Sequence, residues 1–157
     1  MHVVAISGSL KQSSANSALV RSLASVAPDL VEVWAGLGDL PHFTPDDDGG
    51  ASVASLRVAV TRADALVVAT PEYAGGMPGV LKNALDWLVG TGELYDKPVA
   101  IVSAAPSPER GVNARRWVED VVRMQGGHVV DSFTVTTSDE PRAVLTRVVD
   151  ALEAVRH

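Results

Sequence analysis

The chain has 157 residues, of which 46% are hydrophobic and 20% are charged, and it contains no cysteine. This composition is typical of a globular protein, and the length predicts a single domain over residues 1–157. The net charge of -6 disfavours nucleic acid and anionic membranes as partners, and the lack of cysteine excludes disulfides and thiolate chemistry. With neither a signal-peptide pattern nor an apolar run of membrane-spanning length, we expect a cytoplasmic protein.

Short apolar runs alternate with helical periodicity along the whole chain. Runs without polar interruption predict strands that are buried on both faces, as in a parallel sheet. The expected strands are Val3–Ile6, Val31–Trp34, Ala65–Ala69, Pro98–Ser103 and Val129–Val135. Parallel strands need long right-handed crossovers, so the pattern predicts an α/β fold with a three-layer, doubly wound, five-stranded parallel sheet.

Five helices are predicted from their apolar faces. The defining positions are Ala15, Leu19, Leu23 and Val26; Val53, Leu56, Val60 and Ala63; Leu81, Ala84, Leu85 and Leu88; Trp117, Val118, Val121 and Val122; and Val144, Leu145, Val148, Val149, Leu152 and Val155. Pro78 is expected in the first turn of the third helix, and Arg115 on the charged side of the fourth. The fifth helix should have Pro141 in its first turn and a cap near Ser138.

The acidic run and the histidines give no metal site. Asp46 to Asp48 do not have the spacing of a calcium loop, and we interpret them as a solvated loop before a helix N-terminus. The four histidines, His2, His42, His128 and His157, are scattered over strand starts, a loop and the chain end. No metal cofactor is therefore predicted.

The segment after the first strand has the chemistry of a phosphate site. Ser9, Lys11, Ser13, Ser14 and Asn16 offer hydroxyl, ammonium and amide donors where a helix presents unpaired N–H groups. The spacing matches neither the lysine-containing phosphate loop of nucleoside triphosphatases nor the triple-glycine motif of dinucleotide folds. A serine-rich helix cap with an exposed lysine is the alternative interpretation.

The segment after the third strand suits a flat heterocycle. Gly75 and Gly76 permit close backbone approach, Pro71 stiffens the start of the loop, and Tyr73 and Met77 offer apolar contact. A purely structural turn is an equal alternative. Because loops after parallel strands meet at one edge of the sheet, the two segments together predict a ligand with a phosphate and a planar ring.

Two motifs carry a resemblance to a known family. G-S-L-K-x-x-S-x-N follows the first strand, and P-E-Y-x-x-x-x-P-G-x-L-K-N-A-L-D-W follows the third. In this order and context they resemble the NAD(P)H-dependent FMN reductase family of the flavodoxin-like superfamily. The likeness extends to L-P-H-F-T-P-D and A-D-A-L-V-V-A-T. It implies strand order 2-1-3-4-5, noncovalent FMN, NADPH or NADH as co-substrate, and a homodimer or homotetramer.

The resemblance also implies the residues that hold FMN. Those for the phosphate are Ser9, Lys11, Ser14 and Asn16, and those for the ring are Pro71, Glu72, Tyr73, Ala74, Gly75 and Ser103. Hydride would pass from nicotinamide to FMN N5 and then to a quinone, an azo compound or a flavin, so no catalytic side chain is predicted. For Glu72, a salt bridge or subunit contact is favoured over proton donation. The alternative functions are a flavin-binding electron carrier and a flavin-free regulatory or interaction module.

The sequence departs from the family pattern at three places. Lys11 stands where arginine is commoner, which replaces a two-point grip on phosphate by a point charge. Ala74 replaces a frequent asparagine beside the ring. The segment from Ser103 to Gly111 lacks the glycine-rich character that often marks the third flavin loop.

Overall fold

The structure, a computed structural model, describes residues 1–155 of the chain. The strands are β1 (Val3–Ser7), β2 (Val31–Trp34), β3 (Ala65–Ala69), β4 (Pro98–Ala104) and β5 (His128–Val135). The helices are α1 (Ala15–Val26), α2 (Gly50–Arg62), α3 (Gly79–Trp87), α4 (Val112–Met124) and α5 (Pro141–Ala154), with a short 3-10 turn, η1 (Leu37–Asp39). All strand pairs are parallel in the order β2-β1-β3-β4-β5, which confirms the predicted fold.

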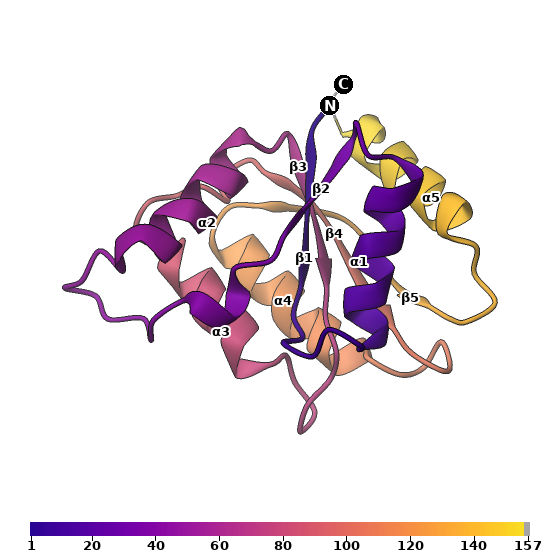
Figure 1. Cartoon of the computed structure of the whole chain (residues 1–157), viewed down its shortest axis with the longest axis horizontal. Coiled ribbons are helices and arrows are strands. Elements are labelled where there is room, and N and C mark those ends of the chain that lie inside the picture. The colour runs from indigo at the N-terminus through magenta and orange to yellow at the C-terminus, as the bar shows by residue number, and fades with distance from the viewer. Residues whose placement is uncertain (156–157) are drawn as a thin grey trace.

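Helices cover both faces of the sheet, with α1 and α5 on one side and α2, α3 and α4 on the other (Figure 1). Successive side chains of a strand point to opposite faces. In β1, Val3 and Ala5 pack toward α1 and α5, whereas Val4 and Ile6 pack toward the other helices. This double burial explains why the strands have apolar runs rather than alternating polar residues.

Two predicted helix starts are shifted. Pro78 is the N-cap of α3, one position before the first turn in which it was expected. Pro141 lies in the first turn of α5 as predicted, but the N-cap is Glu140 and its side chain makes no capping bond. The cap predicted near Ser138 is wrong, because the Ser138 hydroxyl contacts Thr136 Oγ1 at 2.8 Å instead.

The predicted orientation of α4 is wrong at two positions. Arg115, expected on the charged side, is only 7% exposed, whereas Trp117, expected on the apolar face, is 54% exposed. The buried stripe of α4 runs through Ala114, Arg115, Val118 and Val122, which a helical period of 3.6 residues places together. Trp117 packs instead over the backbone of Gly76, where an added Cβ would lie 2.9 Å from the indole ring.

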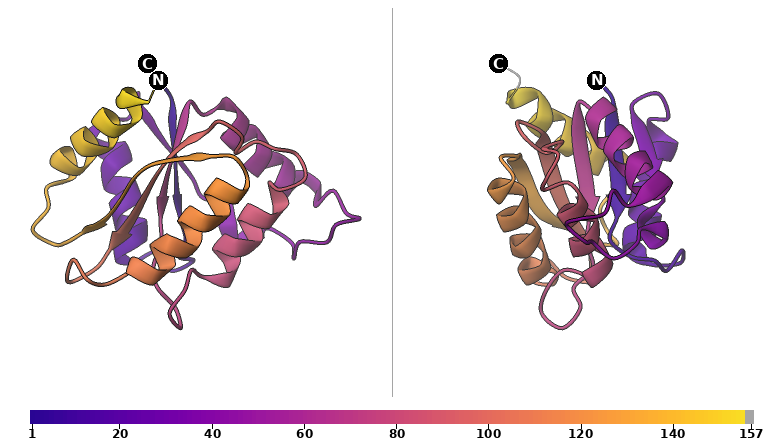
Figure 2. Two further views of the ribbon diagram at one scale, coloured as in Figure 1. Left: turned by 180° about the vertical axis from the view of Figure 1, so that it is seen from behind. Right: turned by 90° about the vertical axis from the view of Figure 1, so that its left-hand side faces the viewer.

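The loops after β1, β3 and β4 meet at the carboxyl edge of the sheet, at the lower end in Figure 1 and opposite the N-terminus. The loop between β3 and α3 projects beyond the other two from this end (Figure 2). At the start of α2, Asp47 and Asp48 each accept a hydrogen bond from a backbone N–H two residues ahead, which agrees with a loop leading into a helix. None of the helices in residues 1–155 is long and apolar enough to cross a membrane.

Candidate functional site

A cleft of about 380 Å³ opens at the carboxyl edge between the loops that follow β3 and β4 and the start of α1. Its lining comprises Asn16, Thr70, Pro71, Glu72, Ser103, Ala104, Ala105, Pro106, Glu109, Arg110 and Gly111. The fold therefore brings Asn16, Pro71, Glu72 and Ser103 of the predicted site together. This edge is where open α/β sheets bind ligands.

The other predicted residues lie outside this lining. Ser9 borders a neighbouring groove of about 450 Å³, between α1 and the end of β2. The remaining ones, Lys11, Ser14, Tyr73, Ala74 and Gly75, belong to the β1–α1 and β3–α3 loops. The lining also includes Ala104, Ala105, Pro106, Glu109 and Arg110, which belong to the segment expected as the third flavin loop but were not predicted individually. Thr70 was not predicted, because it carries no motif of its own.

Hydroxyl groups hold the β1–α1 loop in shape. Ser14 is the N-cap of α1, and its Oγ accepts a hydrogen bond of 3.0 Å from the Ser17 backbone N–H. Ser9 Oγ accepts from the Lys11 N–H at 3.2 Å, and Ser17 Oγ donates to the Lys11 carbonyl at 3.1 Å. Ser17 was not predicted, although a serine three residues after the cap could have indicated this role. Within residues 1–155 the exposed Lys11 ammonium forms neither a hydrogen bond nor an ion pair.

Asn16 joins the start of α1 to the end of β4. Its side chain is 4% exposed, and its Oδ1 accepts a hydrogen bond of 2.9 Å from the backbone N–H of Ala104, 88 residues further along the chain. A buried amide oxygen without a donor would destabilise the fold, so this bond fixes one end of the cleft. The Nδ2 group is the part of Asn16 that stays available to a ligand.

The β3–α3 loop is a tight hairpin. Tyr73 and Gly76 exchange two backbone hydrogen bonds, of 3.0 and 3.1 Å. Both central residues have positive φ, 50° at Ala74 and 78° at Gly75, as a type I′ turn requires. The Tyr73 side chain is 56% exposed on this hairpin.

Glu72 connects the hairpin to α4. Its Oε2 accepts hydrogen bonds from the backbone N–H groups of Asn113 and Ala114, at 3.1 and 3.2 Å. These are unpaired donors of the first helical turn, and a carboxylate there also meets the positive end of the helix dipole. Among residues 1–155 Glu72 forms no ion pair, so the structure does not contain the salt bridge that was one of the two favoured roles. The subunit contact stays a prediction.

Ser103 shapes the wall by packing and not by offering its hydroxyl to the cleft. The side chain is 1% exposed, and Oγ donates to the Thr70 carbonyl at 2.9 Å. Gly111, with φ of 80°, lies directly on it, since an added Cβ would stand 2.6 Å from both Ser103 Cβ and Oγ. Only glycine fits this close contact at this backbone conformation.

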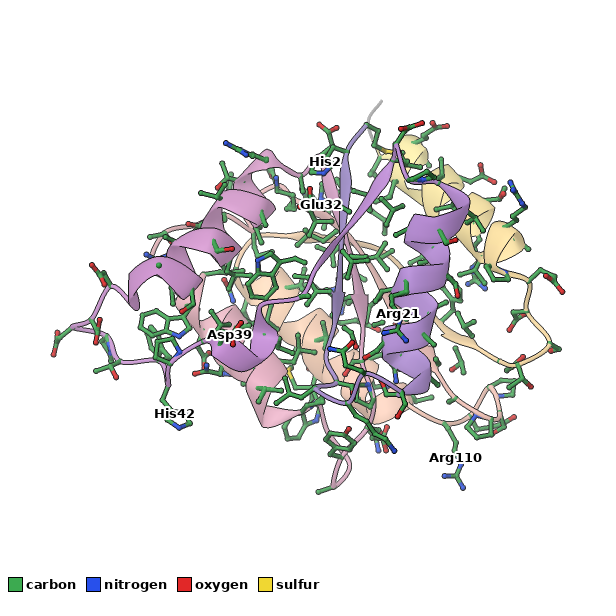
Figure 3. The ribbon with its side chains drawn as sticks, in the orientation of Figure 1. His2, Arg21, Glu32, Asp39, His42 and Arg110 are labelled. Carbon is green, nitrogen blue, oxygen red and sulfur yellow. The ribbon has the colours of Figure 1, made fainter. Side chains whose placement is uncertain are left out.

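The charged groups at the cleft have distinct environments. The pKa of Glu109 is lowered first by the Ser107 hydroxyl and then by its own backbone N–H. Burial lowers the pKa of Arg115 behind the cleft, against opposing contributions from Glu119 and Glu72. Arg110 projects from the molecule at the same end (Figure 3).

His2, His42 and His128, the histidines in residues 1–155, are not among the residues that line the cleft. His2 contacts Glu32 at 3.0 Å at the opposite end of the molecule (Figure 3), and His128 contacts Asp96 at 3.1 Å. His157 lies outside the described residues. In residues 1–155 no group of three histidine, cysteine, aspartate or glutamate side chains is arranged to hold a metal ion.

A doubly wound sheet of order 2-1-3-4-5 with a cleft at its carboxyl edge defines the flavodoxin-like class of nucleotide-binding folds. Within this class, the chain matches the NADPH-dependent FMN reductase family over residues 1–141. It belongs to that family, as the two loop motifs indicated.

Individual proteins support the same assignment. The quinone reductase of Escherichia coli K12 is 39% identical over 106 residues, which cover 64% of this chain and 55% of that protein. A 2-hydroxy-1,4-benzoquinone reductase from a Burkholderia species is 38% identical over 111 residues, 67% of this chain and 61% of that protein. The chain thus matches less than two thirds of the length of either relative.

A solved structure shows the same fold over nearly the whole chain. FerB, a flavoenzyme NAD(P)H:acceptor oxidoreductase from Paracoccus denitrificans, superposes with a TM-score of 0.78. The match covers 98% of this chain and 97% of FerB at 24% sequence identity. At this level of identity the likeness establishes the architecture.

Proposed function

We propose that the protein is an FMN-dependent oxidoreductase that takes hydride from NADPH or NADH and passes it to a quinone, an azo compound, a flavin or a similar planar acceptor. The observation that carries the proposal is the cleft at the carboxyl edge, formed by the loops that bear the family motifs. Family membership and the names of the two quinone reductase relatives support the reaction class.

The start of α1 fits the phosphate of FMN. The first-turn N–H groups of Ala15 and Asn16 have no hydrogen-bond acceptor within residues 1–155, and Lys11 supplies an uncommitted positive charge beside them. Unpaired N–H groups, the helix dipole and an ammonium group together favour a dianion. Ser9 and Ser14 order this loop, so their proposed contribution is to hold its backbone donors in place.

The cleft fits the ring of FMN. Pro71 and Glu72 line one side, Ser103 lies at the base, and the hairpin residues Tyr73, Ala74 and Gly75 extend the first side outward. When bound, FMN supplies the hydride acceptor, and the protein supplies position and electrostatics. Glu72 holds the hairpin against α4, so the two sides of the ring keep a fixed separation.

We further propose a cytoplasmic homodimer or homotetramer. Nicotinamide nucleotides, the proposed co-substrates, are cytoplasmic metabolites. Tyr73 lies on the hairpin and is 56% exposed. Trp117 lies on the face of α4 that packs against the hairpin and is 54% exposed. Exposed aromatic side chains at one place are typical of interfaces. Light scattering on the wild type and on Trp117→Asp tests the assembly, which the charged residue should weaken.

Binding of FMN and its reduction test the activity. Purified protein titrated with FMN should quench flavin fluorescence, and either NADPH or NADH should bleach the flavin bands, which a quinone then restores. Absence of FMN binding would overturn the proposal. Bound FMN that neither nucleotide bleaches would favour the electron carrier.

The phosphate position has its own test. Lys11→Glu should lower FMN affinity at least tenfold, because a charge-assisted hydrogen bond of roughly 1.5–3 kcal/mol is replaced by repulsion. Lys11→Arg, which restores the commoner residue, should bind FMN at least as well as the wild type. Equal affinity of the glutamate variant would mean that the phosphate lies elsewhere.

A further inference from the structure

A polar network lies behind the wall of the cleft that follows β4. Arg115 is 7% exposed, and its Nη1 donates to Thr134 Oγ1 at 2.7 Å and to the Arg110 carbonyl at 3.4 Å. Thr134 Oγ1 in turn lies 3.0 Å from the Pro108 carbonyl and 3.1 Å from that of Arg110. Two side chains from α4 and β5 thus hold the backbone of residues 108–110.

In residues 1–155 no carboxylate pairs directly with the guanidinium of Arg115, although the negative charges of Glu119 and Glu72 act on it from nearby. Glu119 pairs with Arg123 at 3.0 Å, and Glu72 caps α4. Its buried Nε has no hydrogen-bond partner. Arginine stays protonated in proteins, so a cation is held in a partly desolvated place at a cost to stability.

This cation stands immediately behind the cleft. A methyl group added to Gly111 would lie 3.4 Å from Arg115 Nη1, and Gly111 itself lines the cleft, as does Arg110. The guanidinium is therefore separated from a bound ligand by the thickness of one backbone segment. At that depth a charge is screened less than it would be at the surface.

We propose that Arg115 is a positioning residue that fixes residues 105–111 as the wall of the cleft that follows β4, and that its charge favours reduced over oxidised FMN. The second part rests on the proposed function. Reduced flavin at neutral pH carries more negative charge than oxidised flavin, and nearby charge tunes the electronics of such a cofactor. The network also holds in place a segment that lacks the glycine-rich sequence often found in the third flavin loop of the family.

Four variants separate the hydrogen bonds of Arg115 from its charge. Arg115→Met removes both. Arg115→Lys keeps the charge without the paired guanidinium donors, and Thr134→Val removes the hydrogen bond between Arg115 and Thr134 but keeps the charge. Arg116→Met, one residue further on the exposed side of α4, is the control for loss of a surface charge. The measurements are the FMN affinity, the midpoint potential of bound FMN, and amide hydrogen exchange of residues 105–111 in the FMN-free protein.

The expected pattern is specific. Arg115→Met and Thr134→Val should each speed amide exchange of residues 105–111 at least fivefold. Only Arg115→Met should lower the midpoint potential of bound FMN. If the affinity for reduced FMN falls tenfold while that for oxidised FMN is unchanged, the potential of this two-electron couple falls by about 30 mV. Arg115→Lys should keep the wild-type potential, and its residues 105–111 should lose part of their protection from amide exchange. Arg116→Met should match the wild type in both.

The outcomes distinguish this proposal from the function on which it rests. If the wild type fails to bind FMN, the proposed function and the redox role both fall, while hydrogen exchange still decides the structural role. If FMN binds and Arg115→Met changes neither the potential nor the exchange, the proposal is overturned and the function stands. Thermal unfolding of each variant shows whether it folds. If Arg115→Met does not fold, amide exchange in Arg115→Lys tests the positioning role instead.

Discussion

The two walls of the cleft are built on opposite principles. The β3–α3 hairpin, residues 73–76, is closed by its own backbone through two hydrogen bonds and a type I′ turn. The β4–α4 segment, residues 104–111, is held by side chains of three other elements, namely Asn16 of α1, Arg115 of α4 and Thr134 of β5. A wall closed locally can move as one piece, whereas a wall held from several elements moves only if they do.

This difference has an energetic consequence. The hairpin is exposed at Tyr73, Ala74 and Gly75, so a change there meets water and not packed atoms. The second wall is buried at Gly111, which lies against Ser103 and leaves no free volume for an added atom, whereas Pro106 and residues 108–110 are exposed. Overpacking should therefore add to the cost of a substitution at Gly111 but not at Gly75.

The sharpest test compares two glycines with the same backbone conformation. Gly111 has φ of 80° and would place a Cβ 2.6 Å from Ser103, while Gly75 has φ of 78° and nothing within 4 Å. Gly75→Ala should cost about 1–2 kcal/mol for the left-handed conformation alone. Gly111→Ala adds overpacking of about 1–3 kcal/mol and should cost about 2–5 kcal/mol in total. Urea unfolding of both variants measures the difference, and equal losses would mean that the second wall yields as easily as the hairpin.

Asn16 gives the next largest effect. Asn16→Ala leaves the half-buried Ala104 N–H without an acceptor and should lower the free energy of unfolding by about 1–3 kcal/mol. Asn16→Asp keeps an acceptor oxygen but brings a negative charge to the proposed phosphate site. It should retain more stability than the alanine variant in urea unfolding and bind FMN more weakly than the wild type in titration. The opposite ranking in stability would show that the Asn16 bond does not hold the wall.

The contrast between the walls also explains what the sequence could predict. The hairpin was recognised as a turn because Pro71 and Gly75 are local signals, and the fold followed from apolar runs that are contiguous in the chain. Asn16 was chosen for a phosphate from its motif, and its bond to Ala104 depends on two segments 88 residues apart. Arg115 was placed on the charged side because a guanidinium is ordinarily solvated, and only the tertiary contact with Thr134 accounts for its burial.

Glu72 connects the start of the hairpin to the first turn of α4, directly after the second wall, and its removal should have a moderate effect. Glu72→Ala should cost about 1 kcal/mol, as expected for a lost helix cap, and Glu72→Gln about half of that because an acceptor remains. Glu109→Ala is the control, since the carboxylate of Glu109 bonds to Ser107 within its own loop. Urea unfolding gives the stabilities, and amide exchange at Asn113 and Ala114 should rise only when Glu72 is changed. Unchanged exchange there would show that the hairpin and α4 are independent.

The smallest expected effect lies at Ala74 and has the opposite sign. Alanine at φ of 50° occupies a conformation that glycine and asparagine adopt more readily, and a type I′ turn favours asparagine followed by glycine at its two central positions. Ala74→Gly and Ala74→Asn should therefore raise the free energy of unfolding by about 0.5–1 kcal/mol, while Ala74→Val should lower it. Because the hairpin is closed by its own backbone, this gain should leave amide exchange of residues 104–111 unchanged. A stabilised hairpin that also slowed exchange in those residues would show that the walls respond together, and Glu72→Ala in the same background would then reveal whether its carboxylate transmits the effect.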